Sequence, residues 1–475
     1  MNKPHWQQAA GLLMLTTLLG GCASFGQDSE PAKPLTAEAL KLPAGGRAAV
    51  AADWWRQLDD AALNQLIQTA LAQSPSLKLA DARLREARAA VGLTESREGP
   101  QVSANASMDR ERYSLYGLFP PPIGGNFYNV YTLSLGGSWE IDFWGKHRAE
   151  VKAALGNQQA IALEASQARL TITQAVIAQY TSLQRIQAQQ DVLKARQQLA
   201  ESRVALVRAR VNAGLLSADA LNQAEIQTRR LSQQQSALAA DLDHARHALA
   251  ALSGQTPDAL KGLQAAAMKP APQLQDAALT LDLLGRRPDI VAQRMRVEAM
   301  NESIKAAKAE FYPNVSLTGF IGQSALESGN LLKNQSRVLG ITPAISLPIF
   351  TSGALQSNLA ATRARYDMAV ESYNQTVLDA LRDAADSLST WQKTASQLSD
   401  SRQATRLSRK DSDSTTARFK AGLVNKLAVL DAQEADLNQQ SGHIDALAAN
   451  RLAWSALNTA LGGGFSTSEA SQPTR

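Results

Sequence analysis

The sequence predicts a mainly helical α+β fold that is built from two copies of one unit and contributes four β-strands. Three observations predict it. Two prolines recur at one spacing, since Pro75 and Pro288 are 213 positions apart and so are Pro100 and Pro313. After each closing proline, apolar and polar residues alternate, as in half-buried strands. Each alternating stretch leads into a helical pattern far longer than a globular core needs.

Residues 1–21 have the layout of a signal peptide, with a charged start at Lys3, a short apolar run and small residues before a cleavage site. Cys22 follows this segment and is the only cysteine of the chain. It stands where a bacterial lipoprotein carries its acylated cysteine, and a free thiol after an ordinary signal peptide is the alternative. We therefore expect lipidation at Cys22 and a lipidated N-terminal arm over residues 22–52.

The rest of the chain divides into the two copies. We expect the first repeat over residues 53–265, the second over 266–464, and a disordered tail over 465–475. Each repeat should contain short helices, a β-hairpin and a long helical hairpin. The β-hairpins are expected over 101–144 and 314–350, and the helical hairpins over 147–254 and 354–461.

The alternating stretches have the length of membrane-spanning strands, because a tilted strand needs about ten residues to cross a bilayer. Nine of the 24 aromatic residues lie within residues 113–144, and Tyr and Trp favour membrane interfaces. The apolar positions are Tyr131, Leu133, Leu135, Trp139, Ile141 and Phe143 in the first repeat, and Val315, Leu317, Ile321, Leu339, Ile341, Ile345, Leu347 and Ile349 in the second.

Four strands cannot close a barrel, and an open sheet edge cannot face lipid. Three copies of the chain would supply twelve strands, an even number in the usual range. We therefore predict a homotrimer with one transmembrane β-barrel that continues as a helical tube, which is a conduit. A soluble periplasmic coiled-coil scaffold with two small hairpins is the alternative from another class. The strand length and the clustered aromatic residues disfavour it.

Each helical hairpin contains one glycine turn. Residues 210–215 correspond to residues 418–423 at an offset of 208, and a glycine after a helix indicates a left-handed C-cap. Gly214 and Gly422 therefore mark the hairpin tips. The arm before Gly214 has about 65 residues, or about 100 Å of helix. A resting channel must be closed at this end. The charges beside the second turn that could bridge neighbouring helices, and are therefore candidates for a periplasmic aperture, are Asp411, Asp413, Arg418 and Lys420.

Other functional classes find little support. The net charge of +5 is small and dispersed, which argues against nucleic acid. His244 and His247 lie three apart without a third ligand, so we expect no metal site. The carboxylate pairs Asp59-Asp60 and Asp411 with Asp413 lack partners that would mark an acid and a base. We expect no cofactor and no catalytic residues, and therefore no enzyme.

Several motifs together resemble the outer-membrane factor family, the TolC-type channels of tripartite efflux pumps, and in particular its lipoprotein branch. The resemblance implies a trimer with a shared twelve-stranded barrel and a periplasmic α-helical barrel closed at its far tip. The motifs are Trp55-Arg56-Gln57-Leu58, Glu140-Ile141-Asp142-Phe143-Trp144-Gly145, Arg287-Pro288-Asp289-Ile290, Phe311-Tyr312-Pro313, Pro348-Ile349-Phe350 and Leu430-Asp431-Ala432-Gln433.

The resemblance also implies the function and the partners. The chain is expected in the cell outer membrane, lipid-anchored and extending into the periplasm, where it passes drugs or other small toxic compounds outward. A periplasmic adaptor protein and an inner-membrane pump of the resistance-nodulation-division or major-facilitator type are the implied partners, and a protein-secretion channel is the alternative. Lipoprotein members carry an acidic residue six positions before the turn glycine, but Thr416 stands there in this chain, so the resemblance does not identify the tip seal.

Overall fold

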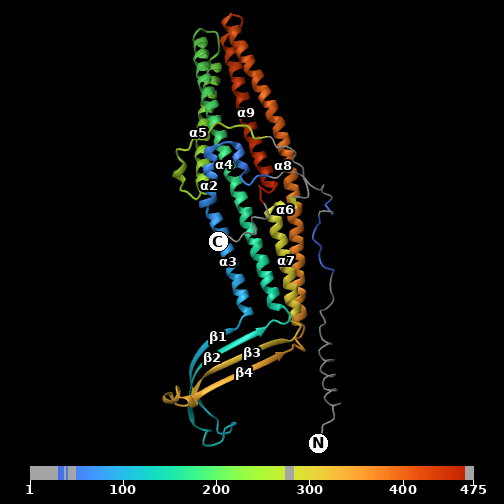
Figure 1. Cartoon of the computed structure of the whole chain (residues 1–475). Coiled ribbons are helices and arrows are strands. Elements are labelled where there is room, and N and C mark those ends of the chain that lie inside the picture. Colours follow the sequence, from blue (N-terminus) through green and yellow to red (C-terminus); the bar gives the residue numbers. More distant parts are fainter. Residues whose placement is uncertain (1–29, 37–38, 41–49, 273–282, 466–475) are drawn as a thin grey trace. The chain divides into compact units, whose positions relative to one another are not determined.

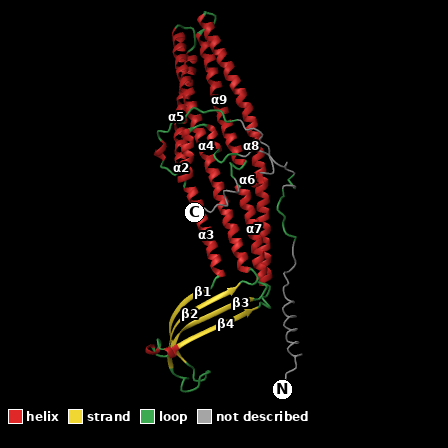
Figure 2. Ribbon diagram, viewed as in Figure 1, coloured by secondary structure: helices red, strands yellow, loops and turns green. Residues whose placement is uncertain are grey.

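The structure is a computed structural model that describes residues 30–36, 39–40, 50–272 and 283–465 (Figure 1). The chain forms two compact units, and each unit takes segments from both repeats. All strands of the described chain belong to the first unit (Figure 2). The first unit contains residues 30–34, Arg85–Ala160 and Gln293–Tyr373, and the second contains the described parts of Leu35–Leu84, Ile161–Ala292 and Asn374–Arg475.

The four strands form one antiparallel sheet in the order β1-β2-β3-β4. The two repeats meet at its centre, because β2 of the first repeat pairs directly with β3 of the second. The prediction of four strands per chain and a mainly helical α+β fold is confirmed. The strands are β1 (Gln101–Arg112), β2 (Phe127–Ile141), β3 (Asn314–Ala325) and β4 (Arg337–Ser346).

The strand pattern extends less far than the sequence predicts. Phe143 was expected to continue the alternation, but β2 ends at Ile141 and the Phe143 amide donates to the Ile141 carbonyl in a tight turn. Leu347 and Ile349 were expected on the returning strand, but β4 ends at Ser346. Pro348 explains this end, because proline has no N–H for the strand ladder. All three side chains are exposed past the strand ends.

Two helical hairpins of equal size follow the strand pairs. The long arms α4 (Lys146–Asn212) and α8 (Ala354–Lys420) have 67 residues each. The return arms α5 (Ala218–Leu252) and α9 (Lys426–Ala460) have 35 residues each. The equal lengths confirm the internal duplication, and a helix of 67 residues is about 100 Å long.

Shorter helices precede each strand pair. α3 and α7 begin at the recurring prolines Pro75 and Pro288, where a missing N–H has little cost. Among the helices of the described residues, none combines the length and the hydropathy that a membrane-spanning helix requires. The short elements are α2 (Ala61–Gln73), α3 (Pro75–Glu95), α6 (Leu283–Arg286), α7 (Pro288–Ala309) and the 3-10 turns η1 (Trp54–Leu58), η2 (Ser96–Glu98), η3 (Pro257–Leu260), η4 (Ser328–Asn330) and η5 (Asn334–Ser336).

Two tryptophans anchor the core of the second unit. Trp54 of η1 and Trp454 of α9 are fully buried, with ring centroids 5.3 Å apart. Trp55 meets Trp54 edge to face at 6.2 Å and is only partly buried. The paired tryptophans of the sequence are therefore packing anchors, which hold η1 against the helices around them. Tyr180 of α4 and Leu249 of α5 belong to the same buried cluster.

Candidate functional site

The sheet has one apolar face, which the strand register defines. Directly opposed residues of an antiparallel pair share a face. Leu135 of β2 lies opposite Ala104 of β1 and Ile321 of β3, and Ile321 lies opposite Leu339 of β4. The same register assigns to the apolar face Val102, Ala104, Ala106 and Met108 of β1, Tyr131, Leu133, Leu135, Trp139 and Ile141 of β2, Val315, Leu317 and Ile321 of β3, and Leu339, Ile341 and Ile345 of β4.

The opposite face of the sheet is polar. Its rows run from strand to strand in the same way, as in Asn105, Ser134 and Gly322. Phe320, Val130 and Val338 are apolar exceptions, and the Phe320 ring lies against Gly340. The polar face is formed by Ser103, Asn105 and Ser107 of β1, Thr132, Ser134, Gly136, Ser138 and Glu140 of β2, Ser316, Thr318, Gly322 and Ser324 of β3, and Gly340, Thr342 and Ala344 of β4.

The apolar face has the dimensions of a membrane-spanning surface. Leu339, Ile341 and Ile345 are 70%, 77% and 75% exposed, so the chain itself does not cover it. On β2 the apolar positions extend from Tyr131 to Ile141, ten residue steps or about 33 Å of strand. At the usual tilt of about 40° this corresponds to a height of roughly 25 Å, which is the apolar band of a transmembrane barrel.

The two outer strands have free edges. β1 and β4 stand at the ends of the sheet order, and neither has a second strand neighbour among the described residues. Unpaired backbone N–H and C=O groups cost several kcal/mol each in hydrocarbon. A sheet with this apolar face therefore requires strands from other chains to close it in a membrane.

Two of the sequence motifs meet where the strands join the helices of the first unit. Trp144, which follows β2, stacks on Tyr312, which precedes β3, with centroids 4.8 Å apart and planes 19° apart. The Trp144 indole donates to the Pro313 carbonyl at 2.7 Å. Asp142 accepts from the backbone N–H of Arg148 at 3.1 Å and so stabilises the start of α4. The two contacts of Trp144 fix the repeats to each other at the end of the apolar face.

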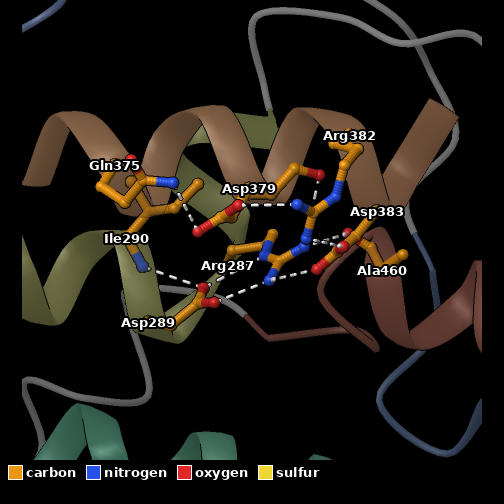
Figure 3. Close-up of polar contacts among 9 residues, drawn as sticks. Arg287, Asp289, Ile290, Gln375, Asp379, Arg382, Asp383 and Ala460 are labelled. Carbon is orange, nitrogen blue, oxygen red and sulfur yellow. Dashed lines mark hydrogen bonds and ion pairs between the residues drawn. The ribbon is translucent and has the colours of Figure 1, made fainter. Parts of the chain in front are cut away.

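Arg287 of the Arg287-Pro288-Asp289 motif is the buried centre of a polar cluster in the second unit (Figure 3). Arg287 binds Asp289 through two parallel hydrogen bonds of 3.1 and 2.7 Å. Its remaining terminal nitrogen lies 3.4 Å from the Ala380 carbonyl of α8 and 3.5 Å from the Ala460 carbonyl at the end of α9. One guanidinium therefore connects the start of α7 to both helices of the second hairpin.

The hairpin tips have the same geometry in both repeats. Gly214 and Gly422 have φ values of +72° and +75°. At the first tip, the Gly214 amide donates to the Val211 carbonyl at 2.9 Å and the Leu215 amide to the Arg210 carbonyl at 2.8 Å. The second tip repeats both bonds around Gly422. This is the Schellman arrangement, which requires a left-handed residue at the turn and therefore favours glycine.

A row of charged contacts joins α4 to α9, and so one hairpin to the other within the chain. Sequence reasoning missed it, because the partners lie more than 220 positions apart. One signal was present, since Arg185, Arg196 and Arg203 are spaced by 11 and 7 residues and lie on one helix face. The pairs are Arg185–Asp445 at 3.4 Å, Arg196–Glu434 at 2.8 Å and Arg203–Asp431 at 2.5 Å.

The four charges named for the aperture are exposed, and the structure does not bring them together. Asp413 lies 4.0 Å from Arg409, one turn away on α8. Arg409 in turn lies 3.6 Å from Asp436 of α9, a carboxylate that is only 5% exposed and that sequence reasoning missed. Asp411, Arg418 and Lys420 have exposed side chains near the same turn.

The residues weighed as catalytic or metal-binding candidates either have structural roles or are exposed. Asp60 caps α2 by accepting from the Leu63 amide, and it also accepts from the Tyr180 hydroxyl at 3.0 Å. Burial, together with the Asp60 charge, raises the pKa of Tyr180, so the phenol stays a donor. His244 and His247 are exposed on α5. Within the described ranges, no cluster of metal-binding side chains is found.

The sequence matches the outer membrane efflux protein family over residues 66–255 and again over 279–463. The second match starts 213 residues and ends 208 residues after the first, the two offsets that relate the repeats. The chain belongs to this family. The prediction of a TolC-type outer-membrane efflux channel is thereby confirmed, and the soluble scaffold is set aside.

Named relatives and solved structures agree with the family. The multidrug resistance outer membrane protein MdtP of Shigella flexneri is 33% identical over 79% of this chain and 79% of its own. MdtQ of Escherichia coli O6:H1 carries the same description and is 30% identical over 98% of this chain and all of its own. The outer membrane protein VceC of Vibrio cholerae is 33% identical, has a TM-score of 0.78, and the match covers 88% of this chain and all of VceC. The fold is also that of the Campylobacter jejuni outer membrane channel CmeC, at 21% identity and a TM-score of 0.83 over 94% of this chain and 96% of that one.

Family membership settles the class of activity and the compartment. The protein is an outer-membrane efflux channel, so transport is its function, and the absence of enzymatic activity stays a prediction. Cys22 lies outside the described residues, and its lipidation likewise stays a prediction.

Proposed function

We propose that three copies of this chain form one channel, with a shared twelve-stranded barrel in the outer membrane and a periplasmic barrel of helices. One observation carries the proposal, namely a four-stranded sheet with an exposed apolar face and two free edges. Twelve is an even strand number in the range of outer-membrane barrels. The polar face, rich in Ser, Thr and Gly, then lines the lumen, where water satisfies the hydroxyl groups.

We infer that the channel receives its cargo from a periplasmic adaptor and an inner-membrane pump of the resistance-nodulation-division or major-facilitator type. The cargo is drugs or other small toxic compounds. MdtP and MdtQ are described as multidrug resistance proteins, which supports this substrate class. The long arms α4 and α8 support the proposal of an adaptor partner, because helices of about 100 Å provide a docking surface far from the membrane.

Deletion of the gene with the pump intact tests this proposal. Susceptibility to a panel of small toxic compounds should rise, and the wild-type gene supplied in trans should restore resistance. The matched control is a strain that lacks only the pump, which should show the same susceptibility profile. If susceptibility to every compound stays unchanged and one secreted protein disappears from the medium, the protein-secretion alternative is correct.

We further propose that Cys22 carries the lipid anchor. Its position after Leu19-Gly20-Gly21 supports this, and Ala23 is of the type found in outer-membrane lipoproteins. Acyl chains contribute about 0.8 kcal/mol of membrane-binding free energy per buried methylene. A closed barrel is held in the membrane by the apolar side chains of every strand. The anchor therefore adds to an insertion that the barrel already provides.

We also propose that charges near the second tip bias the channel toward a closed state. Arg409, Asp413 and Asp436 already form a short chain of contacts between α8 and α9. Exposed pairs are worth roughly 0 to 1 kcal/mol each. Three-fold symmetry would repeat each contact three times, so weak contacts of Asp411, Asp413, Arg418 and Lys420 with helices of neighbouring copies would add up to a bias toward the closed state.

A further inference from the structure

Charged residues at the loop ends of the sheet are sorted by face. On β1, the residues with even numbers share the apolar face with Val102 and Ala104, because Met108 lies opposite Tyr131 and Arg110 opposite Asn129. Arg110 and Arg112 therefore continue the apolar face, whereas Asp109 and Glu111 lie on the polar face.

A third arginine has the same placement at the other edge. Arg337 is the first residue of β4 and lies opposite Gln323, two positions beyond the pair Leu339 and Ile321 of the apolar face. It is therefore on the apolar face, at the end of β4 that adjoins the loop. The face that carries the large apolar side chains thus ends in three arginines at its loop end.

These arginines are held in place but not neutralised. Arg110 lies over the Phe127 ring at 5.4 Å from its centroid. Arg112 donates to the Gly125 carbonyl at 3.1 Å, and Arg337 donates to the Asn334 side-chain oxygen at 3.1 Å. All three are exposed, and within the described residues none forms an ion pair with a carboxylate. The site therefore offers guanidinium groups with donors to spare and no acidic neighbour on their own face.

The height of the arginines along β1 matches the polar boundary of a bilayer. The apolar band on β1 ends at Met108, and Arg110 and Arg112 are the next two residues on that face. An arginine on the lipid side costs roughly 2–4 kcal/mol at the bilayer midplane but roughly 0–1 kcal/mol near the interface. Arginines just past the apolar band therefore lie level with lipid headgroups, where a planar guanidinium can bind phosphate through two parallel hydrogen bonds.

The three arginines also lie on the two strands that border each contact between copies. β1 and β4 are the free edges, so in the proposed trimer β4 of one copy adjoins β1 of the next. Each of the three junctions then carries Arg110 and Arg112 on one side and Arg337 on the other. Like charges at a junction repel each other unless an anion lies between them, and phosphate is the anion that this depth of the membrane supplies.

We propose that Arg110, Arg112 and Arg337 form a binding site for phosphorylated glycolipid headgroups of the outer leaflet at each junction between copies. The inference rests on the proposed trimeric barrel. A membrane-spanning sheet needs an apolar surface for the lipid chains. The proposed site adds a specific contact with a lipid headgroup at the loop end of that surface.

Native mass spectrometry of the full-length protein in detergent tests this site, with bisphosphorylated lipid A as the probe. The variant combines Arg110→Gln, Arg112→Gln and Arg337→Gln, and lipid A should bind it at least tenfold more weakly. The matched control combines Asp109→Asn with Glu111→Gln on the opposite face of β1, and it should bind like the wild type. Dephosphorylated lipid A should bind all three proteins equally weakly.

A second variant has lysine at all three positions, which keeps the positive charge but removes the planar guanidinium and its two parallel hydrogen bonds. It guards against a folding defect and should bind with intermediate affinity. If the glutamine variant binds lipid A like the wild type while both proteins are trimers that conduct in planar bilayers, the lipid site is refuted and the channel stands. If the wild-type chain neither trimerises nor conducts, the proposed function is refuted and the lipid site with it.

Discussion

Substitution of Arg287 by methionine should strongly destabilise the protein, because Arg287 connects the start of α7 and the end of α9 to the middle of α8 from a buried position. Its side chain is 10% exposed, and it forms a two-bond contact with Asp289, whose side chain is 27% exposed. Methionine keeps much of the volume and removes the charge. Asp289 would then keep a half-buried carboxylate without its partner, and the Ala380 and Ala460 carbonyls would lose a donor.

The magnitude follows from burial. Removal of one partner of a fully buried ion pair costs about 3–5 kcal/mol. Because Asp289 retains some contact with water, we expect about 2–3 kcal/mol for Arg287→Met. That corresponds to a change of roughly 30-fold to 140-fold in the unfolding equilibrium. Arg382 provides a matched control in the same cluster, since it pairs with Asp379 at 3.1 Å but is 65% exposed (Figure 3). Arg382→Met should stay within about 0.5 kcal/mol of the wild type.

Urea unfolding measures both changes. The helical circular dichroism signal of the full-length protein should be followed at fixed protein concentration, and a shift in midpoint at constant slope reports stability. In a double-mutant cycle with Asp289→Asn, the combined variant should lose less than the sum of the single losses, because the charge no longer lacks a partner. If Arg287→Met is as mild as Arg382→Met, the buried cluster does not stabilise the fold and the reasoning is wrong.

The remaining predictions concern the tips and the anchor. Gly214→Val and Gly422→Val should each disrupt a turn and weaken adaptor docking, because a left-handed residue with a side chain costs about 1–2 kcal/mol and a β-branched one more; a pull-down with the adaptor measures this. Reversal of both Asp413 and Arg418 should raise single-channel conductance in planar bilayers, and a wild-type conductance would exclude these two residues from the seal. Cys22→Ser should abolish lipidation while leaving channel in the membrane, and an unmodified Cys22 in the mass spectrum of the mature wild-type protein would end the anchor proposal.

Local signals made the repeat, the strands and the turns predictable. Alternation over Tyr131 to Ile141 reports a two-sided surface directly, and a glycine after a long helical stretch reports a left-handed turn, as Gly214 and Gly422 show. The strand ends were less predictable. Phe143 continues the alternation of apolar and polar residues, but an apolar residue at that position does not show where the hydrogen-bond ladder of the strand ends.

Contacts between distant segments were beyond the reach of the sequence. Arg196 and Glu434 are 238 positions apart, and nothing local in either helix identifies the other. The stacking of Trp144 on Tyr312 has the same origin, because the two motifs were visible but their meeting depends on how the strands pair. The buried carboxylate of Asp436 was missed because burial of a polar residue on a long helix depends on which face a neighbour covers.

Cross-linking between the two edge strands tests the central claim most directly, namely that several copies share one barrel. Cysteines would be introduced in pairs, one on β1 and one on β4, at positions on the polar face. Cross-linking would be carried out in the intact outer membrane. Single-cysteine variants serve as controls. We predict that at least one cysteine pair gives a ladder of cross-linked products that ends at three chains. If every pair gives only monomers, or if the ladders continue past three chains, the shared barrel is contradicted. The positions are Ser103, Asn105 and Ser107 on β1, each combined with Thr342 and Ala344 on β4.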